Sequence, residues 1–411
     1  MKRIIFHIDV NNAFLSWTAV KLLNEGYKDI RQIPSVIGGD EASRRGVVLA
    51  KSPVAKSMGI KSGIPLYEAR KICKELKVFP PDFEWYGKQS YKFIKYLEKY
   101  SPSIEQYSID ECFIDMTGTN YLYKDYIKLA NDIKNEIKEK LGFTVNIGIG
   151  ENKLCAKMAS NFEKPDKVHT LFPDEIVKKM WPLDVGELFM VGKSTTKELK
   201  NIGVKTIEDL ARTDEKKLTK KFKSMGEYLH KAAWGIDDSP VETEYRERKS
   251  ISTERTLSKD INDKEKLKDI IYKETLEITR DLRRRKLYAK TVGVIYKDIE
   301  FKKYSAQSTL KSPSNSDKEI YKKILEVFND SYKEEPIRLI GVKLANLTNR
   351  KDSQISIFDL EEKDNTEEFQ ETIDKLNEKF GRSLIEPASL KLINKEKWNN
   401  KIDNYITTKN R

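Results

Sequence analysis

The chain has 411 residues, of which 77 are Lys or Arg and 65 are Asp or Glu, giving a formal net charge of +12. This length argues against one compact core and indicates roughly two to four domains, at about 150 residues each. The basic balance favours a nucleic acid or another polyanion as partner, although a solvated lysine-rich surface would also produce it.

Cysteine and histidine usage excludes several kinds of site. Cys73, Cys112 and Cys155 are widely spaced and form no C-x-x-C pair, which argues against a disulfide framework and a zinc site. The three histidines are too scattered for a metal cluster, so any metal must bind carboxylates. The apolar start MKRIIFHID is interrupted by Asp9 and is too short for a signal peptide or a membrane span. We therefore expect a cytoplasmic protein without a membrane partner.

The first part of the chain is typical of an α/β layer. A β-branched strand over 4–8 ends at Asp9, and QYSIDECFIDMTG at 106–118 predicts a β-hairpin with Asp110 and Glu111 near its tip. Since neighbouring side chains of a strand point to opposite faces, the backbone must bend between these two acids if both serve one site. The order predicts a sheet with helices packed on one side and the acids on neighbouring central strands. The other expected segments are a small insertion over 11–76, helices at 88–100, 124–140 and 152–162, and a strand over 143–150.

Residues 188–211 predict two helices joined by a tight turn at Gly203. The run Gly192-Lys193-Ser194 is similar to the end of a P-loop, but the first glycine of that motif would fall at position 187, which is Glu187. A helix-hairpin-helix, whose amides at a helix start hold a DNA phosphate, fits the charge and spacing better, although its usual second glycine is missing. We therefore expect Gly192 and Lys193 to bind DNA.

A polar stretch over 234–247 is typical of a linker to a separate domain. Arg283, Arg284 and Arg285 close the first helix of that domain, where cations complement the helix dipole and can also contact DNA phosphates. A merely solvated helix end is an equal alternative for this cluster, which also contains Lys286. The segments expected in this domain are strands at 249–257, 290–298, 302–310 and 337–347 and helices at 263–285 and 317–328; a last helix is expected at 367–380.

The acidic residues define the chemistry. Carboxylates without histidine or thiolate ligands select hard cations such as Mg²⁺ or Mn²⁺. Two such ions can activate an attacking oxygen and stabilise a leaving oxygen in phosphoryl transfer. Asp9, Asp110 and Glu111 supply the charge for this. A basic protein with such a cluster and a phosphate-gripping module is expected to act on nucleic acid.

Several segments, taken together, resemble one enzyme family. HIDVNNAF at the start, GIKSGIP at 59–65, YSIDECFID, GIGENKLCAKMASNFEKP at 148–165 and the helix-hairpin-helix resemble, in this order, the bacterial Y-family translesion DNA polymerases. The resemblance covers residues 1–350 and implies an α/β and α+β multidomain right-hand polymerase. Its expected parts are a palm (1–10 and 75–165), fingers (11–74), a thumb with the helix-hairpin-helix (166–234), a linker (235–247), a little finger (248–349) and a C-terminal tail (350–411).

The resemblance also implies an activity and a metal site. The enzyme would be a DNA-directed DNA polymerase of the lesion-bypass type, adding deoxynucleotides to a primer 3′ end by two-metal phosphoryl transfer without proofreading. Asp9, Asp110 and Glu111 would hold two Mg²⁺ ions, replaceable by Mn²⁺, and Val10 would offer its backbone carbonyl.

Two further residues match the substrate side of the family's site. Phe14, five positions after Asp9, matches the aromatic steric gate that leaves no room for a ribose 2′-hydroxyl. Lys164 in EKPD matches the lysine that contacts the incoming triphosphate. The matching blocks also contain residues that we treat as scaffold: Ser108, Asp115 and Lys157.

One segment departs from the family pattern. Many members carry Tyr and Arg in a YEAR stretch over the triphosphate, where this chain has Pro53 and Lys56. Lys56 supplies a point charge but not the bidentate geometry of arginine, and Pro53 offers no hydroxyl.

The tail contains a short apolar peptide, residues 354–358, in a polar surrounding. This peptide is similar to the motif with which bacterial polymerases dock on the sliding clamp, with Gln354, Ile357 and Phe358 as anchors. The expected partners are therefore primer-template DNA, a deoxynucleoside triphosphate and the clamp, bound by a monomer.

Two alternatives remain from the sequence. One is a catalytically impaired relative that serves as a clamp-bound adaptor of damage tolerance, against which the retained acids and Lys164 argue. The other is a nucleotide cyclase on a similar palm, which would need neither the helix-hairpin-helix nor the basic second domain to hold duplex DNA.

Overall fold

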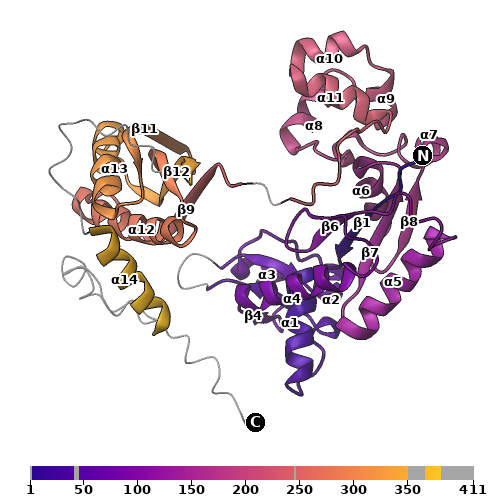
Figure 1. Cartoon of the computed structure of the whole chain (residues 1–411), viewed down its shortest axis with the longest axis horizontal. Coiled ribbons are helices and arrows are strands. Elements are labelled where there is room, and N and C mark those ends of the chain that lie inside the picture. Colours follow the sequence, from indigo (N-terminus) through magenta and orange to yellow (C-terminus); the bar gives the residue numbers. More distant parts are fainter. Residues whose placement is uncertain (1, 41–45, 245–246, 350–365, 381–411) are drawn as a thin grey trace. The chain divides into compact units, whose positions relative to one another are not determined.

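The computed structural model describes residues 2–40, 46–244, 247–349 and 366–380. The chain divides into two compact units, one containing the described residues up to 244 and the other those from 247 onward (Figure 1). None of the helices in these ranges is long and apolar enough to cross a lipid bilayer.

A five-stranded sheet forms the centre of the first unit. Its strands are β1 (Ile5–Val10), β5 (Ile104–Gln106), β6 (Glu111–Asp115), β7 (Val145–Gly150) and β8 (Val168–Leu171), in the order β5-β6-β1-β7-β8. β1 is antiparallel to both β6 and β7, and only β7 and β8 are parallel. The prediction that the acids lie on neighbouring central strands is confirmed, because β1 pairs directly with β6.

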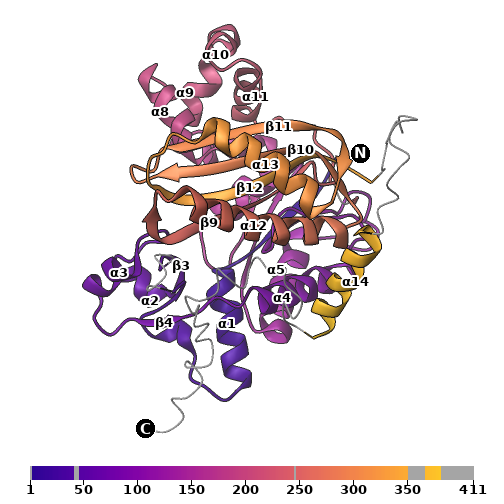
Figure 2. The same cartoon turned by 90° about the vertical axis from the view of Figure 1, so that its left-hand side faces the viewer.

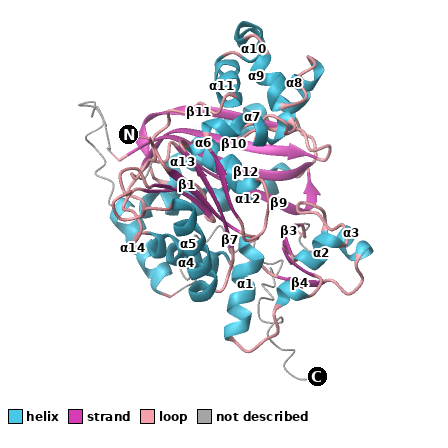
Figure 3. Cartoon of the chain, turned by 90° about the vertical axis from the view of Figure 1, so that its right-hand side faces the viewer, coloured by secondary structure: helices cyan, strands magenta, loops and turns pink. Residues whose placement is uncertain are grey.

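Helices cover both faces of this sheet, so the prediction of helices on one side was wrong. Phe6 and Ile8 pack with side chains of α4 (Phe83–Leu97) and α5 (Tyr126–Leu141), whereas Ile5 packs with Ala156 of α6 (Lys153–Asn161) on the opposite face. Figure 3 shows α4 and α5 next to each other beside the strands of this sheet. Helix α6 lies so close to β7 that a Cβ atom at Gly148 would stand 2.0 Å from the carbonyl oxygen of Ala156. The small residues of the GIG run therefore permit a packing layer that periodicity alone does not reveal.

The small insertion is a subdomain with its own sheet. Its strands are β2 (Ser35–Gly38), β3 (Val48–Lys51) and β4 (Lys77–Phe79), and its helices are α1 (Ala13–Asn24), α2 (Pro53–Ser57) and α3 (Leu66–Ile72). β4 pairs in parallel with β2, so this subdomain continues past residue 74, where we expected the fingers to end. The helix expected from residue 88 begins at Phe83, where Asp82 caps it by accepting from the N–H of Trp85 at 3.0 Å.

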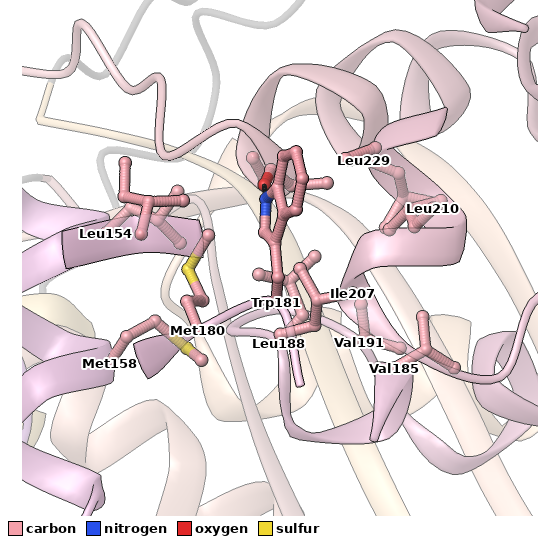
Figure 4. Packing of buried hydrophobic residues seen from close by; sticks show 14 of the residues in the cluster. Leu154, Met158, Met180, Trp181, Val185, Leu188, Val191, Ile207, Leu210 and Leu229 are labelled. Atoms are coloured by element: carbon pink, nitrogen blue, oxygen red, sulfur yellow. Dashed lines mark hydrogen bonds between the residues drawn. The ribbon is translucent and has the colours of Figure 1, made fainter. Parts of the chain in front are cut away.

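The end of the first unit is a helical bundle that shares a core with the palm. Its helices are α7 (Ile176–Lys179), α8 (Lys193–Asn201), α9 (Ile207–Arg212), α10 (Glu215–Phe222) and α11 (Ser224–Ala233). The predicted helix pair with a turn at Gly203 corresponds to α8 and α9, and Gly203 has a φ of +89°. Trp181 lies among side chains of α6, α9 and α11, and its indole N–H donates to the carbonyl of Ala233 at 3.0 Å (Figure 4).

The start of the expected linker is attached to the palm. The side-chain amide of Asn152 donates to the carbonyl of Gly235 at 2.7 Å, and the N–H of Glu242 donates to Glu105 at 2.8 Å. Glu105 also forms an ion pair with Lys153 at 2.6 Å. These contacts hold the chain against the palm as far as Glu242.

The second unit is a four-stranded antiparallel sheet with helices on one face (Figure 2). Its elements agree with the expected order of one strand, one helix, two strands, one helix and one strand. They are β9 (Ser250–Ile261), α12 (Lys264–Arg284), β10 (Tyr288–Asp298), β11 (Lys303–Ser314), α13 (Asp317–Ser331) and β12 (Ile337–Thr348). The late helix is confirmed as α14 (Thr366–Lys379), whereas the peptide Gln354–Phe358 lies outside the described residues.

Candidate active site

The three acids meet where β1 ends beside the β5–β6 hairpin. Asp9 stands directly opposite Glu111 in the antiparallel register, so their side chains share one face of the sheet. Asp110 lies in the turn before β6, and its carbonyl accepts from the N–H of Val10 at 2.9 Å. The backbone therefore bends at Asp110, as we expected if Asp110 and Glu111 are to serve one site.

Glu111 is held ionised by two neighbours. The Nε2 atom of His7 lies 3.1 Å from its carboxylate, and Lys157 forms an ion pair with it. Burial alone would raise the pKa of Glu111, but the hydrogen bonds from His7 and Lys157 lower it to about 2. His7 is itself fully buried, which lowers its pKa, and its Nδ1 lies 2.8 Å from the hydroxyl of Ser160.

The sequence analysis treats Lys157 as scaffold and gives His7 no role beyond excluding a histidine metal cluster, whereas the structure places both against Glu111. His7 is two residues before Asp9 on the same strand, so its side chain lies on the same face of the sheet. That period of two was the signal in the sequence that would have identified it.

Asp110 is partly buried beside two other carboxylates. Burial raises its pKa, and the nearby carboxylates of Asp9 and Glu111 raise it further. A hydrogen bond from the hydroxyl of Ser108, at 2.7 Å, acts in the opposite direction. A cation at this site would relieve the repulsion among the three carboxylates.

Lys164 reaches the site from the loop after α6 and forms an ion pair with Asp9. The loop is fixed next to β1 because the side-chain oxygen of Asn11 accepts from the N–H of Asp166 at 2.9 Å. Asn11 also donates to Asn146 of β7 at 2.9 Å. The structure therefore brings Lys164 to the acids, as its position in EKPD suggested.

The donor set fits a divalent ion of the hard type, because it consists of oxygen atoms alone. Among the residues that the structure describes, no three His, Cys, Asp or Glu side chains form a ready metal-binding cluster. Asp9 and Glu111 each direct an oxygen at a lysine, and these two carboxylates would have to exchange that partner to bind a metal together with Asp110.

Phe14 lies in the first turn of α1 and belongs to an aromatic cluster that the sequence analysis missed. Its ring stacks on Tyr86 of α4, with 4.7 Å between the ring centroids and 12° between the planes. Tyr86 is fully buried, and its hydroxyl lies 2.8 Å from that of Thr18. Because Tyr86 is 72 residues further along the chain, no local pattern links the two rings.

Lys56 lies on α2 and is exposed. Lys51, at the end of β3, is close enough to Lys56 for the two positive charges to repel each other. Burial lowers the pKa of Lys51, and the charge of Lys56 lowers it further. The carbonyl of Lys51 accepts from the side chain of Asn12 at 2.5 Å, which ties β3 to the turn after Asp9. The fingers therefore place positive charge beside the start of α1.

Gly192 and Lys193 stand at the start of α8. No side chain caps this helix, and a Cβ atom at Gly192 would meet nothing within 4 Å. Lys193 lines an open groove of about 560 Å³ with other residues of the hairpin: Asp184, Gly186, Glu187, Thr196, Lys197, Lys200 and Asn201. The backbone at Gly192 is therefore accessible.

Arg283 does not stand as a free surface cation, contrary to our expectation for DNA contact. Its side chain is 6% exposed and forms ion pairs at 2.7 Å with Asp317 of α13 and Asp374 of α14. Its guanidinium also donates to the carbonyl of Asn315 at 2.9 Å. Arg284 is 63% exposed and, like Arg285, pairs with Asp281 of its own helix. At the end of α12, Arg283 is therefore part of the interior of the second unit, whereas Arg284 lies at its surface.

Comparison with known proteins agrees with this architecture. Residues 8–161 match the model of the impB/mucB/samB family, residues 248–357 match the model of that family's C-terminal domain, and residues 187–237 match the thumb domain of DNA polymerase-iota. The third match coincides with α8, α9, α10 and α11.

Individual relatives span nearly the whole chain. The DNA polymerase IV of Clostridium acetobutylicum is 46% identical over 386 residues, covering 94% of this chain and 97% of the relative. The DNA polymerase IV 1 of Bacillus subtilis is 32% identical, with 93% and 92% covered. A solved Y-family DNA polymerase chimera, Dbh-Dpo4(243-245)-Dbh, superposes with a TM-score of 0.73 at 26% identity, over 84% of this chain and all of that chain. The chain therefore belongs to the impB/mucB/samB family and is a Y-family DNA polymerase of the lesion-bypass type.

Proposed function

We propose that this enzyme extends a primer 3′ end opposite damaged template bases and that Asp9, Asp110 and Glu111 form its catalytic centre. The observation that carries the proposal is the register of β1 against β6, which puts Asp9 opposite Glu111 with Asp110 in the adjoining turn. We also propose synthesis without proofreading, on the strength of the resemblance of the sequence to lesion-bypass polymerases alone.

A polymerase of this family depends on a divalent metal ion, and we propose two Mg²⁺ ions, replaceable by Mn²⁺. The three carboxylates and the carbonyl of Val10 would hold them, since an all-oxygen donor set suits hard cations. Bound in this way, the ions would supply charge stabilisation for the attacking and leaving oxygens of phosphoryl transfer.

The protein's own side chains would bind and orient the nucleotide. Lys164 is close enough to Asp9 to reach a triphosphate bound at the acids, and Lys56 would add a second positive charge from the fingers. Phe14 would act as the steric gate against the 2′-hydroxyl of a ribonucleotide, because its stacking on the buried Tyr86 gives the ring little freedom to move aside.

The thumb and the second unit would hold the DNA. We assign a phosphate contact to Gly192 and Lys193, supported by the uncapped and accessible start of α8. Arg284 and Arg285 remain candidates for a further phosphate contact, whereas the internal ion pairs of Arg283 argue against that role for it.

Three further proposals concern the setting of the enzyme. Gln354, Ile357 and Phe358 would dock on a sliding clamp, on the strength of the sequence alone. The chain would act as a monomer. We place it in the cytoplasm, which is supported by three buried cysteines that are all unpaired.

Primer extension tests the proposal. The natural chain should add nucleotides on undamaged and abasic templates with Mg²⁺, and a variant with Asp110→Ala and Glu111→Ala should not, while both bind primer-template DNA equally. Template-independent turnover of a free nucleotide would favour a cyclase, and DNA binding without any extension by the natural chain would favour the adaptor role. Either result would overturn the proposal.

A further inference from the structure

Phe83 is an exposed aromatic ring beside the steric gate. It is the first residue of α4 and is 61% exposed. Its ring centroid lies 6.0 Å from that of Phe14 with an interplanar angle of 90°, and 5.9 Å from that of Tyr86 at 86°. These are edge-to-face contacts within the range in which aromatic pairs attract each other.

The start of α4 is fixed to α1, the helix that carries Phe14. Lys21 of α1 forms an ion pair with the capping residue Asp82 at 2.7 Å. The indole N–H of Trp85 donates to the carbonyl of Trp17 at 2.8 Å. Phe83 lies between these two attachments in the sequence, so its backbone has a defined position relative to the gate.

Two aromatic rings contact Phe14 in different orientations. Tyr86, which is fully buried, lies nearly parallel to the ring of Phe14, whereas Phe83, which is largely exposed, stands perpendicular to it. An apolar ring with this exposure adds little to folding, since most of its surface is not removed from water. Its contact with Phe14 is therefore the feature that calls for a functional explanation.

We propose that Phe83 is a specificity-determining residue, which fixes the ring of Phe14 against the sugar of the incoming nucleotide and thereby strengthens the exclusion of ribonucleotides. This inference rests on the proposed role of Phe14 as the gate. Phe83 acts through Phe14 and is a positioning residue. Without it, the gate ring retains its stacking on Tyr86 but loses the support that limits its tilt.

The test is the ratio of kcat/KM for a deoxynucleotide to that for the matching ribonucleotide in primer extension by the full chain. Phe83→Ala should lower this ratio by about 2- to 10-fold, the size expected from one aromatic contact. Phe83→Tyr, which keeps the ring, should restore it. Tyr91→Ala is the matched control, because Tyr91 is 64% exposed on the same helix and should leave the ratio unchanged.

A combined variant distinguishes this inference from the gate itself. If Phe83 acts through Phe14, adding Phe83→Ala to Phe14→Ala should reduce the ratio no further. Suppose that Phe14→Ala lowers the ratio, as a steric gate requires. An unchanged ratio in Phe83→Ala, or additive losses in the combined variant, would then overturn the role of Phe83 and leave the gate in place. If Phe14→Ala had no effect on the ratio, both the gate and the role of Phe83 would be refuted.

Discussion

Replacing Arg283 is expected to destabilise the second unit rather than to weaken DNA binding. Arg283→Ala would leave Asp317, which is 13% exposed, without its ion-pair partner, whereas Asp374, which is 12% exposed, would keep only its longer ion pair with Arg280 at 3.4 Å. Removing one partner of a buried ion pair costs about 3–5 kcal/mol, and the residual solvent access of these carboxylates reduces this to about 2–4 kcal/mol. Arg283→Lys should recover only part of the loss, because an ammonium group cannot reproduce two separately directed contacts.

The loss of stability is measured by denaturant unfolding of the full chain, with proteolytic cleavage of the second unit as the readout of its unfolding. Arg284→Ala is the matched control, since its exposed pair with Asp281 should contribute no more than about 0.5 kcal/mol. Salt-dependent DNA binding should be altered little by Arg283→Ala at temperatures where the variant is folded. Unchanged stability together with a clear loss of DNA affinity would refute the reasoning and restore the phosphate contact.

Three other predictions concern the first unit. Trp181→Ala should cost about 3–5 kcal/mol in unfolding free energy, because the indole fills the core shared by thumb and palm and bonds to Ala233; a loss below 1 kcal/mol would contradict this. The pKa of Glu111 is lower in the folded protein, so its contribution to stability should be present above pH 4.5 and disappear as the pH falls toward 2, and Glu111→Gln should remove this part of the pH dependence in acid unfolding. Lys193→Ala should weaken DNA binding equally for all sequences and reduce the slope of log affinity against log salt by about one, whereas an unchanged slope would exclude a phosphate contact.

The elements around the acids could be predicted because their signals are local. A β-branched run ending at Asp9 and a hairpin carrying Asp110 and Glu111 need only the alternation of strands and the cost of burying charge. The helix pair around Gly203 follows from a turn residue between two short amphipathic segments, and the structure shows α8 and α9 there.

Contacts between distant segments could not be predicted from such signals. Glu111 meets His7 across 104 positions, and Tyr86 stacks on Phe14 from a helix that follows the fingers in the sequence. Arg283 shows the same limit for charge: composition identifies a cation but not whether its partner is a phosphate or an internal carboxylate, which depends on how α12, α13 and α14 pack.

The central claim is that the three acids act as one catalytic centre, and single-turnover incorporation of one deoxynucleotide as a function of Mg²⁺ concentration tests it most directly. Asp9→Asn, Asp110→Asn and Glu111→Gln preserve side-chain volume, so each should fold and bind primer-template DNA. Each should nevertheless reduce the rate at saturating nucleotide by at least about 100-fold, as expected for loss of a charge that stabilises the transition state. Incorporation at the natural rate by any of the three, with unchanged dependence on Mg²⁺, would contradict the assignment.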